Sequence, residues 1–202
     1  MFVKLVISAS IKNYFSRIGS GYSLCKGGLF HHAIGTAIIS EKLAEVTGRV
    51  KPGLAYTAGL LHDIGKVVLD QFVSSAYPLF YRKLNDAGSS FSDTEKAIFG
   101  IDHTEIGNDL ARKWSFPESL IDVIRHHHQP EDATRHLELV HTVYLADLIM
   151  SRFNTGLELE RLGTATLSAR LEAIGLSAER FPAIVDLIPV GVFESSPELA
   201  LG

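Results

Sequence analysis

The most informative segment of this 202-residue chain is Leu60-Leu61-His62-Asp63-Ile64-Gly65-Lys66. At the end of a helix, an imidazole and a carboxylate on adjacent residues lie about 100° apart and can both reach one point. Gly65 permits another backbone to approach closely, and the Lys66 ammonium can hold a phosphate as a point charge. The alternative is a polar helix end bonded to backbone. The apolar residues before the His-Asp pair and the Gly-Lys after it favour a metal site.

Further side chains that can bind a metal occur in other segments: His32, His103, His127, His128 and Asp147. Taken singly, four of them have a structural alternative. His103 could belong to a capped helix start, and His127 and His128 could be cations at the negative end of a helix dipole. Asp147 could be one half of a buried salt bridge. With His62 and Asp63 they make seven candidate ligands, too many for one tetrahedral site and suited to two metals bridged by a carboxylate. Mixed His and carboxylate ligands favour Fe, Mn, Zn, Ni or Co.

The other histidines carry less information. We interpret His31, His126, His136 and His141 as solvated or hydrogen-bonded core residues rather than metal ligands. Trp114 is predicted to be a core residue, and Cys25 is predicted to pack as a small apolar side chain.

Apolar residues recur with helical spacing along almost the whole chain. The spacing predicts helices over residues 3–18, 28–46, 52–62, 66–84, 103–114, 117–128, 134–153, 166–174 and 178–188. Pro78 is expected to kink or split the helix over 66–84, and a capping box at Ser92-Asp93-Thr94-Glu95 is expected to open another helix. Alternating strand patterns are nearly absent. The sequence therefore predicts an all-α fold.

No repeat, low-complexity tract or linker divides the chain. We predict a single domain over 1–202, with a leading helix in 1–27, a helical core of about 29–150 around the metal site, and C-terminal helices in 155–202.

The composition narrows the class of protein. Hydrophobic residues make up 46% and charged residues 21%, which is ordinary for a globular chain. The net charge of -4 argues against general nucleic-acid binding, which needs clustered Lys and Arg. One cysteine excludes an internal disulfide. Neither a signal peptide nor a membrane span is found, so we expect no membrane association and a cytoplasmic location.

The order of these residues resembles the HD superfamily of metal-dependent phosphohydrolases. Its pattern of a first His, an His-Asp pair and a late Asp matches His32, His62, Asp63 and Asp147. The stretch from His103 through Trp114-Ser115-Phe116-Pro117 to His127-His128-Gln129-Pro130 is similar to the HDOD and HD-GYP branches. The HDOD family is the closer match, because Gln129-Pro130 follows the double His and the segment 5–15 resembles the helix before the HD core.

The resemblance implies two metal sites. One metal would be held by His32, His62, Asp63 and Asp147. The second would be held by His103, His127 and His128, with Asp63 as the bridge. Asp63 and Lys66 would be the catalytic residues, since Lys66 matches the lysine that contacts substrate phosphate in HD-GYP enzymes.

Three departures from the related patterns bear on activity. Glu131-Asp132-Ala133-Thr134 stands where HD-GYP proteins carry their Gly-Tyr-Pro signature, and Gly28 replaces an acidic residue of some of these enzymes. The leading helical bundle of a typical HDOD module is also missing, which is expected of a fragment of a longer signalling protein.

The resemblance implies a hydrolase that cleaves a nucleotide phosphoester or a cyclic dinucleotide in bacterial signalling, using one or two divalent transition metals. The alternative is a non-catalytic HDOD-type signalling module that keeps the fold and binds a regulatory domain or other partner. A homodimer is compatible with either hypothesis.

Overall fold

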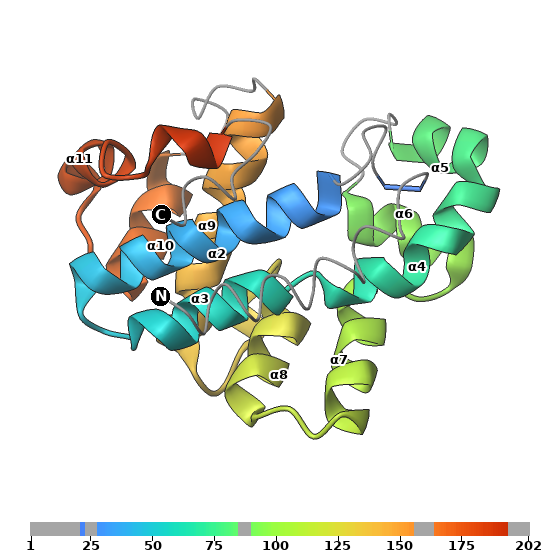
Figure 1. Cartoon of the computed structure of the whole chain (residues 1–202), viewed down its shortest axis with the longest axis horizontal. Helices are drawn as coiled ribbons and strands as arrows, with labels where there is room; N and C mark the ends of the chain where they lie inside the picture. The colour runs from blue at the N-terminus through green and yellow to red at the C-terminus, as the bar shows by residue number, and fades with distance from the viewer. Residues whose placement is uncertain (1–20, 23–27, 85–89, 156–163, 194–202) are drawn as a thin grey trace.

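The computed structural model describes residues 21–22, 28–84, 90–155 and 164–193 (Figure 1). Its α-helices are α2 (Gly28–Thr47), α3 (Pro52–Leu61), α4 (Ile64–Ser75), α5 (Tyr77–Leu84), α6 (Phe91–Phe99), α7 (His103–Lys113), α8 (Glu118–His126), α9 (Leu137–Thr155), α10 (Thr164–Ala173) and α11 (Phe181–Val185). Short 3₁₀ helices are η1 (Pro130–Asp132), η3 (Ala178–Arg180) and η4 (Val190–Phe193). These residues contain no strand, so the all-α prediction is confirmed. The predicted helix over 3–18 and Cys25 lie outside the described residues.

Proline and glycine define several helix boundaries as the sequence predicts. Pro52 occupies the first turn of α3, where its missing N–H needs no partner. The predicted helix over 66–84 is split at Ala76, and Pro78 lies in the first turn of the second piece, α5. Pro78 therefore begins a new helix rather than bending a continuous one.

The predicted capping box at Ser92-Asp93-Thr94-Glu95 is wrong. Ser90 is the N-cap of α6, and its side chain pairs reciprocally with Asp93, the third helical residue. Asp93 therefore completes the capping box. Glu95 lies two residues further along α6, where its side chain is buried and does not cap the helix.

Two further predictions are corrected. The segment 178–188 forms the 3₁₀ turn η3 followed by the five-residue α11, not one continuous helix. Trp114 is the C-cap of α7 and is 51% exposed, so it is not a core residue.

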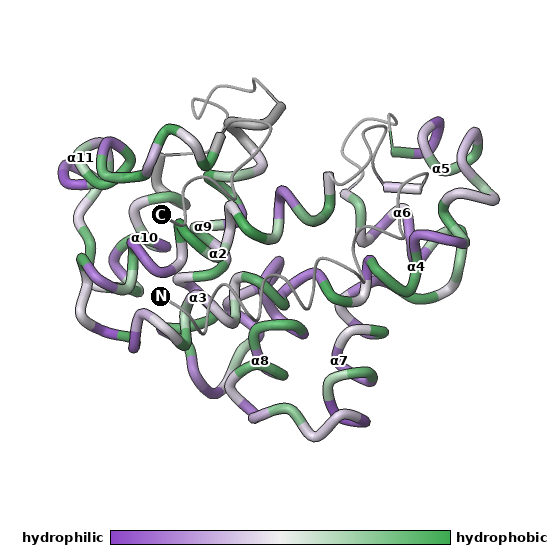
Figure 2. Tube along the Cα trace, in the orientation of Figure 1, coloured by the Kyte–Doolittle hydropathy of each residue, from purple (hydrophilic) through white to green (hydrophobic). Residues whose placement is uncertain are grey.

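The core forms where α2 packs against α3 and α9. Its fully buried side chains include Ile34, Leu43, Tyr56, Leu145 and Ile149. Hydrophobic and hydrophilic residues alternate along the tube in Figure 2, as expected of helices that are buried on one side. A second group of contacts joins α4 to α7 and α7 to α8. In the described part of the chain, no helix is long and apolar enough to cross a membrane.

Two glycines let the helices approach closely at the centre of the bundle. A Cβ on Gly59 of α3 would lie 2.9 Å from the Cα of Ala37 in α2. A Cβ on Gly65 of α4 would overlap the backbone carbonyl of His103 at the start of α7. Gly65 therefore permits the close backbone approach that the sequence predicts, and it brings Asp63 next to His103.

We expect Gly65→Ala to destabilise the protein by about 1–3 kcal/mol, because the added methyl group forces α4 away from α7. The matched control is Gly53→Ala, since a Cβ on Gly53 meets nothing within 4 Å. Its stability should stay the same or rise, because Ala favours a helix more than Gly does. Thermal unfolding followed by circular dichroism measures both. Equal stability of Gly65→Ala and the wild type would contradict this packing constraint.

Candidate metal centre

All seven residues predicted as metal ligands meet at the centre of the bundle. They come from α2, the α3–α4 junction, the start of α7, the end of α8 and the middle of α9. Their donor atoms form two groups, each within 4.8 Å. We call His32, His62 and Asp147 the first cluster, and Asp63, His103, His127 and His128 the second cluster. Either group could hold a metal ion.

Asp63 lies between the two clusters. Its Oδ2 is 3.4 Å from His62 Nε2 and 3.7 Å from His32 Nε2 in the first cluster. Its Oδ1 is 3.5 Å from both His103 Nε2 and His127 Nε2 in the second cluster. Each carboxylate oxygen therefore faces a different cluster, which is the arrangement of a bridging carboxylate.

Three histidine rings are oriented by acceptors on their Nδ1 side. His62 Nδ1 donates to the carbonyl of Gly59 at 2.6 Å, and His127 Nδ1 lies 3.1 Å from the carbonyl oxygen of Ile124. His103 Nδ1 is 2.6 Å from Oε2 of Glu95. Carbonyl and carboxylate oxygens only accept, so the Nδ1 atoms carry the protons and the Nε2 atoms present lone pairs to the centre.

Several of these buried atoms have no hydrogen-bond partner among the described residues: His62 Nε2, His127 Nε2 and Asp63 Oδ1. A buried polar atom without a partner costs about 1–3 kcal/mol. Three such atoms, all carrying lone pairs and converging on one place, are chemically suited to a divalent transition metal. The donor set therefore fits the metal that the HD resemblance implies.

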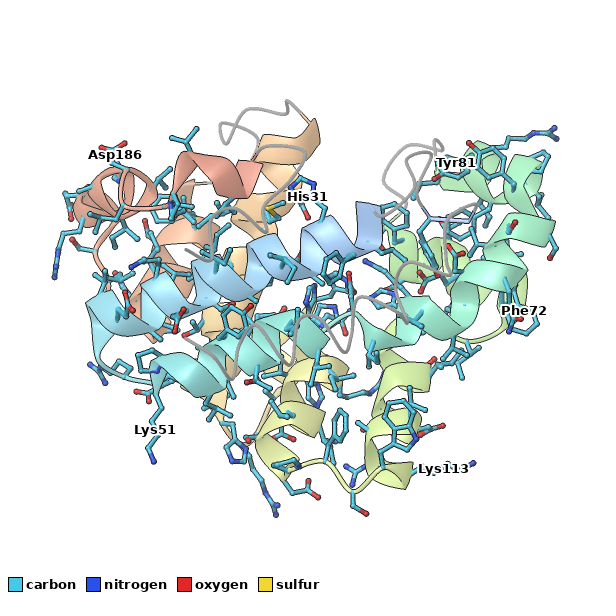
Figure 3. The ribbon with its side chains drawn as sticks, viewed as in Figure 1. His31, Lys51, Phe72, Tyr81, Lys113 and Asp186 are labelled. Carbon is cyan, nitrogen blue, oxygen red and sulfur yellow. The ribbon has the colours of Figure 1, made fainter. Side chains whose placement is uncertain are left out.

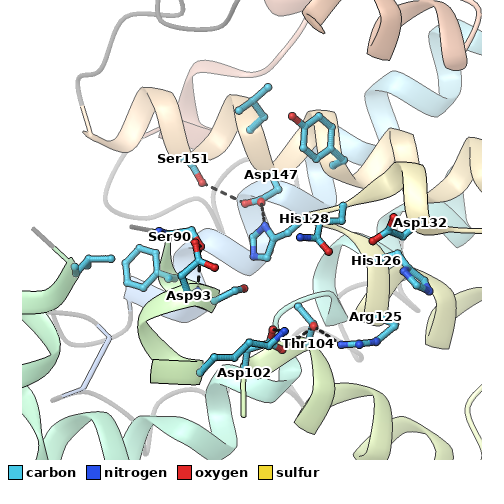
Figure 4. A pocket seen from close by; sticks show the side chains of 17 residues that line it. Ser90, Asp93, Asp102, Thr104, Arg125, His126, His128, Asp132, Asp147 and Ser151 are labelled. Atoms are coloured by element: carbon cyan, nitrogen blue, oxygen red, sulfur yellow. Dashed lines mark hydrogen bonds and ion pairs between the residues drawn. The ribbon is translucent and has the colours of Figure 1, made fainter. Parts of the chain in front are cut away.

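Asp147 and His128 are the candidate ligands that line a pocket (Figure 4). Asp147 Oδ1 is 2.9 Å from His32 Nε2 and accepts a hydrogen bond from Ser151, while Oδ2 is 3.8 Å from His128 Nδ1. His128 Nε2 is in turn 3.0 Å from His103 Nε2. These contacts link the first cluster to the second.

The charges of the site keep its carboxylates ionised. Burial would raise the pKa of Asp63, but the Lys66 ammonium, 2.7 Å from Oδ2, holds it well below its usual range. Burial lowers the pKa of Lys66, yet Asp63 and Asp147 outweigh it and leave the pKa raised. Burial likewise opposes a low pKa for Asp147, and the contact with His32 overcomes it.

Two histidines of the second cluster, His103 and His128, are neutral near pH 7 because their pKa values are lowered. Burial, followed by the Lys66 charge, lowers the pKa of His103. Burial and the neighbouring His127 lower the pKa of His128 well below its usual value. Neutral imidazole is the form that binds metals, so both rings are ready to act as ligands.

Glu95 and Tyr22 belong to the surroundings of the site and were missed by the sequence reasoning. Glu95 contacts His103 from α6, and the Tyr22 hydroxyl donates to Glu95 at 2.7 Å. The only signal in the sequence was a carboxylate on a helix eight residues before His103, and the capping-box interpretation had accounted for it.

The four histidines that were not predicted as ligands lie outside both clusters. His31 projects from α2 toward η4, where its Nε2 is 3.2 Å from the carbonyl oxygen of Val192 (Figure 3). His136 Nδ1 is 2.8 Å from Asp122 Oδ2. His126 lines a pocket, and His141 lies on α9.

A pocket of about 830 Å³ reaches His128 and Asp147 (Figure 4). Its wall combines aromatic, basic and acidic side chains, among them Phe91, Tyr144, Lys96, Arg125, Asp93, Asp102 and Asp132. The candidate metal centre is therefore open to a ligand from this side.

A helical bundle that gathers an His-Asp pair, a preceding His and a late Asp around one bridging carboxylate defines the HD superfamily type of domain. The model of the HDOD domain family matches residues 2–130, and the chain belongs to this family. The resemblance drawn from the sequence is thereby confirmed.

Similar proteins include nucleases and phosphodiesterases. The chain is 31% identical over 154 residues to "Ribonuclease Y" of Thermus thermophilus, covering 76% of this chain and 21% of that protein. It is 27% identical over 101 residues to "Cyclic-di-AMP phosphodiesterase PgpH" of Bacillus subtilis, covering 50% and 14%. The chain spans less than a third of the length of the curated relatives it matches.

A solved structure has the same fold. The crystal structure of an HDOD domain protein with unknown function from Geobacter sulfurreducens is 28% identical, with a TM-score of 0.75. The match covers 95% of this chain and 69% of that protein.

We expect protein purified without added metal to contain one or two transition-metal ions per chain. Asp63→Ala should lose more metal than any other single substitution, because its two oxygens face both clusters. Asp109→Ala, which removes an exposed carboxylate of α7, is the control and should keep the wild-type metal content. Elemental analysis by plasma mass spectrometry gives the stoichiometry. Full metal content in Asp63→Ala would show that Asp63 does not bridge.

Proposed function

We propose that this chain is a metal-dependent phosphohydrolase that cleaves a phosphoester of a nucleotide or a cyclic dinucleotide. The observation that carries the proposal is the position of Asp63, whose two oxygens face two clusters of donors that include unpartnered buried atoms. Two adjacent divalent metals held this way would lower the pKa of a bound water and polarise a phosphoryl oxygen.

In this proposal the chain supplies ligands, charge and orientation. His32, His62 and Asp147 hold one metal, and His103, His127 and His128 hold the other, with Asp63 shared. The acceptors of Gly59, Ile124 and Glu95 fix the rings so that the Nε2 lone pairs already point to the centre. Little reorganisation is then needed when substrate binds, which is the basis of electrostatic catalysis.

In this proposal Lys66 contacts the substrate, as the family resemblance implies. Its buried ammonium is 2.7 Å from Asp63 Oδ2 and 5.5 Å from the centroid of the Phe91 ring, and Phe91 lines the pocket. Lys66 thus lies between the bridging carboxylate and the pocket wall. From there its charge would stabilise the negative charge that grows on a phosphoryl group.

The pocket and the relatives support a nucleotide as substrate. A volume of about 830 Å³ is within the usual range of small-molecule sites. The Phe91 and Tyr144 rings in its wall could pack on a base. The names of both relatives, a ribonuclease and a cyclic-di-AMP phosphodiesterase, refer to the hydrolysis of phosphodiesters between nucleotides.

The second candidate is a non-catalytic signalling module that keeps the fold and the metals. Its support comes from the pocket, where Lys96 is 3.0 Å from Asp102 and Arg125 is 3.6 Å from Glu105. Cations that are already paired attract a phosphate less strongly. A regulatory domain or signalling partner, a homodimer and a cytoplasmic location remain predictions under either candidate.

Lys66→Met and Lys66→Ala separate the two candidates. Because Lys66 is not a ligand, both variants should keep their metals but lose about 10²–10³ in turnover, as other electrostatic stabilisers do. Asp63→Ala should lose metal and turnover together. The measurement is hydrolysis of a panel of nucleotides, cyclic dinucleotides and simple phosphoesters with Mn²⁺, Fe²⁺ or Zn²⁺, alongside metal content.

An absence of hydrolysis would contradict the proposed hydrolase. Metal-loaded wild-type protein that binds a nucleotide or a partner domain, yet hydrolyses nothing in the panel with any of the three metals, would establish the signalling module in place of the hydrolase.

A further inference from the structure

Glu95 is a buried carboxylate that contacts a candidate ligand. It lies on α6 with no exposed surface. Its Oε2 accepts from the backbone N–H of His103 at 2.8 Å and from His103 Nδ1 at 2.6 Å. Its Oε1 accepts from the Tyr22 hydroxyl at 2.7 Å. Three donors on one carboxylate account for a charge that would otherwise be costly to bury.

Glu95 makes the two clusters unequal. His62 in the first cluster and His127 in the second donate from Nδ1 to neutral backbone carbonyls. Of these three anchored rings, only His103 has a carboxylate behind it. A carboxylate on the far nitrogen fixes the ring and raises the basicity of the nitrogen that binds metal, and its loss typically costs about 10–100-fold in metal affinity.

We propose that Glu95 is a positioning residue that orients His103 and, through its negative charge, selectively strengthens the binding of a divalent transition metal by the second cluster. The inference rests on the proposed function, since it requires that both clusters bind metal. It adds to that function a residue that contacts neither metal nor substrate.

Tyr22 holds the opposite end of the carboxylate. Its backbone N–H donates to Asp70 Oδ1 at 2.9 Å, and its carbonyl accepts from the Tyr81 hydroxyl at 3.1 Å. Tyr22 is thereby fixed between α4 and α5 while its hydroxyl restrains Glu95. Both carboxylate oxygens are anchored, so the ring of His103 has one preferred orientation.

The decisive variant is Glu95→Gln, which has the same shape without the charge. The amide oxygen can accept from His103, and the amide nitrogen can donate to the Tyr22 oxygen, whose hydroxyl rotates to accept. The fold should therefore survive, and the thermal unfolding temperature of the metal-free protein should stay close to that of the wild type.

Each cluster is titrated separately with Mn²⁺, and free Mn²⁺ is followed by electron paramagnetic resonance. With the first cluster disabled by His62→Ala, Glu95→Gln should weaken Mn²⁺ binding by about 10–100-fold. With the second cluster disabled by His127→Ala, the same substitution should change the affinity by less than about twofold, because the hydrogen bonds of Glu95 go to His103 and Tyr22 and to no ligand of the first cluster. Glu95→Asp, which keeps the charge, should lose less affinity than Glu95→Gln in the His62→Ala background.

Failure of this inference is distinct from failure of the proposed function. If the wild type binds Mn²⁺ but Glu95→Gln leaves both affinities unchanged, or weakens both equally, Glu95 has no selective role. The inference is also overturned if Glu95→Asp loses more than Glu95→Gln. If the wild type binds no Mn²⁺, Fe²⁺ or Zn²⁺ at all, the proposed metal-dependent function itself is wrong.

Discussion

The architecture of the site depends on one buried carboxylate, that of Asp63, which lies between the two clusters of candidate metal ligands. Asp63 is 1% exposed. Each of its two carboxylate oxygens lies 3.4–3.7 Å from two imidazole nitrogens, and the two pairs of imidazoles belong to different clusters. The Lys66 ammonium stabilises its charge in the absence of metal. Without a nearby positive charge, the buried carboxylate of Asp63 would destabilise the fold, because the imidazole nitrogens around it present lone pairs rather than N–H groups. The Lys66 ammonium therefore compensates the buried charge of Asp63.

The packing of the helices brings the other candidate ligands next to Asp63. Asp63 stands where α3 ends and α4 begins, and its neighbours come from helices distant in sequence. Gly59 lets α3 approach α2, and Gly65 lets α4 approach the start of α7. A side chain at either glycine would separate helices that carry ligands. The small residues around the His-Asp pair are thus part of the site, although they bind nothing.

Helical periodicity predicted most of the fold because helices such as α7 and α8 bury one side, and α2, which is buried on all sides from Ala33 to Ser40, still carries an apolar run of helical length. The seven candidate ligands were predicted because their order along the chain is distinctive, and the helices do bring them together. The local sequence pattern gave the wrong capping box because two overlapping segments both fit the capping-box pattern. Ser90 and Ser92 both precede an acidic residue by three positions, and only tertiary structure shows that Asp93 caps while Glu95 turns to His103. Likewise, the sequence does not show that Trp114, at the end of α7, is half exposed.

We propose that Asp63 joins two metal sites through its two oxygens. A crystal structure of the protein grown with Mn²⁺, with anomalous differences collected at the manganese edge, tests it directly. Two anomalous peaks are expected, one bound by Oδ2 beside His32 and His62, and the other bound by Oδ1 beside His103 and His127. A single peak that Asp63 does not contact, or no peak within the two clusters, would contradict it.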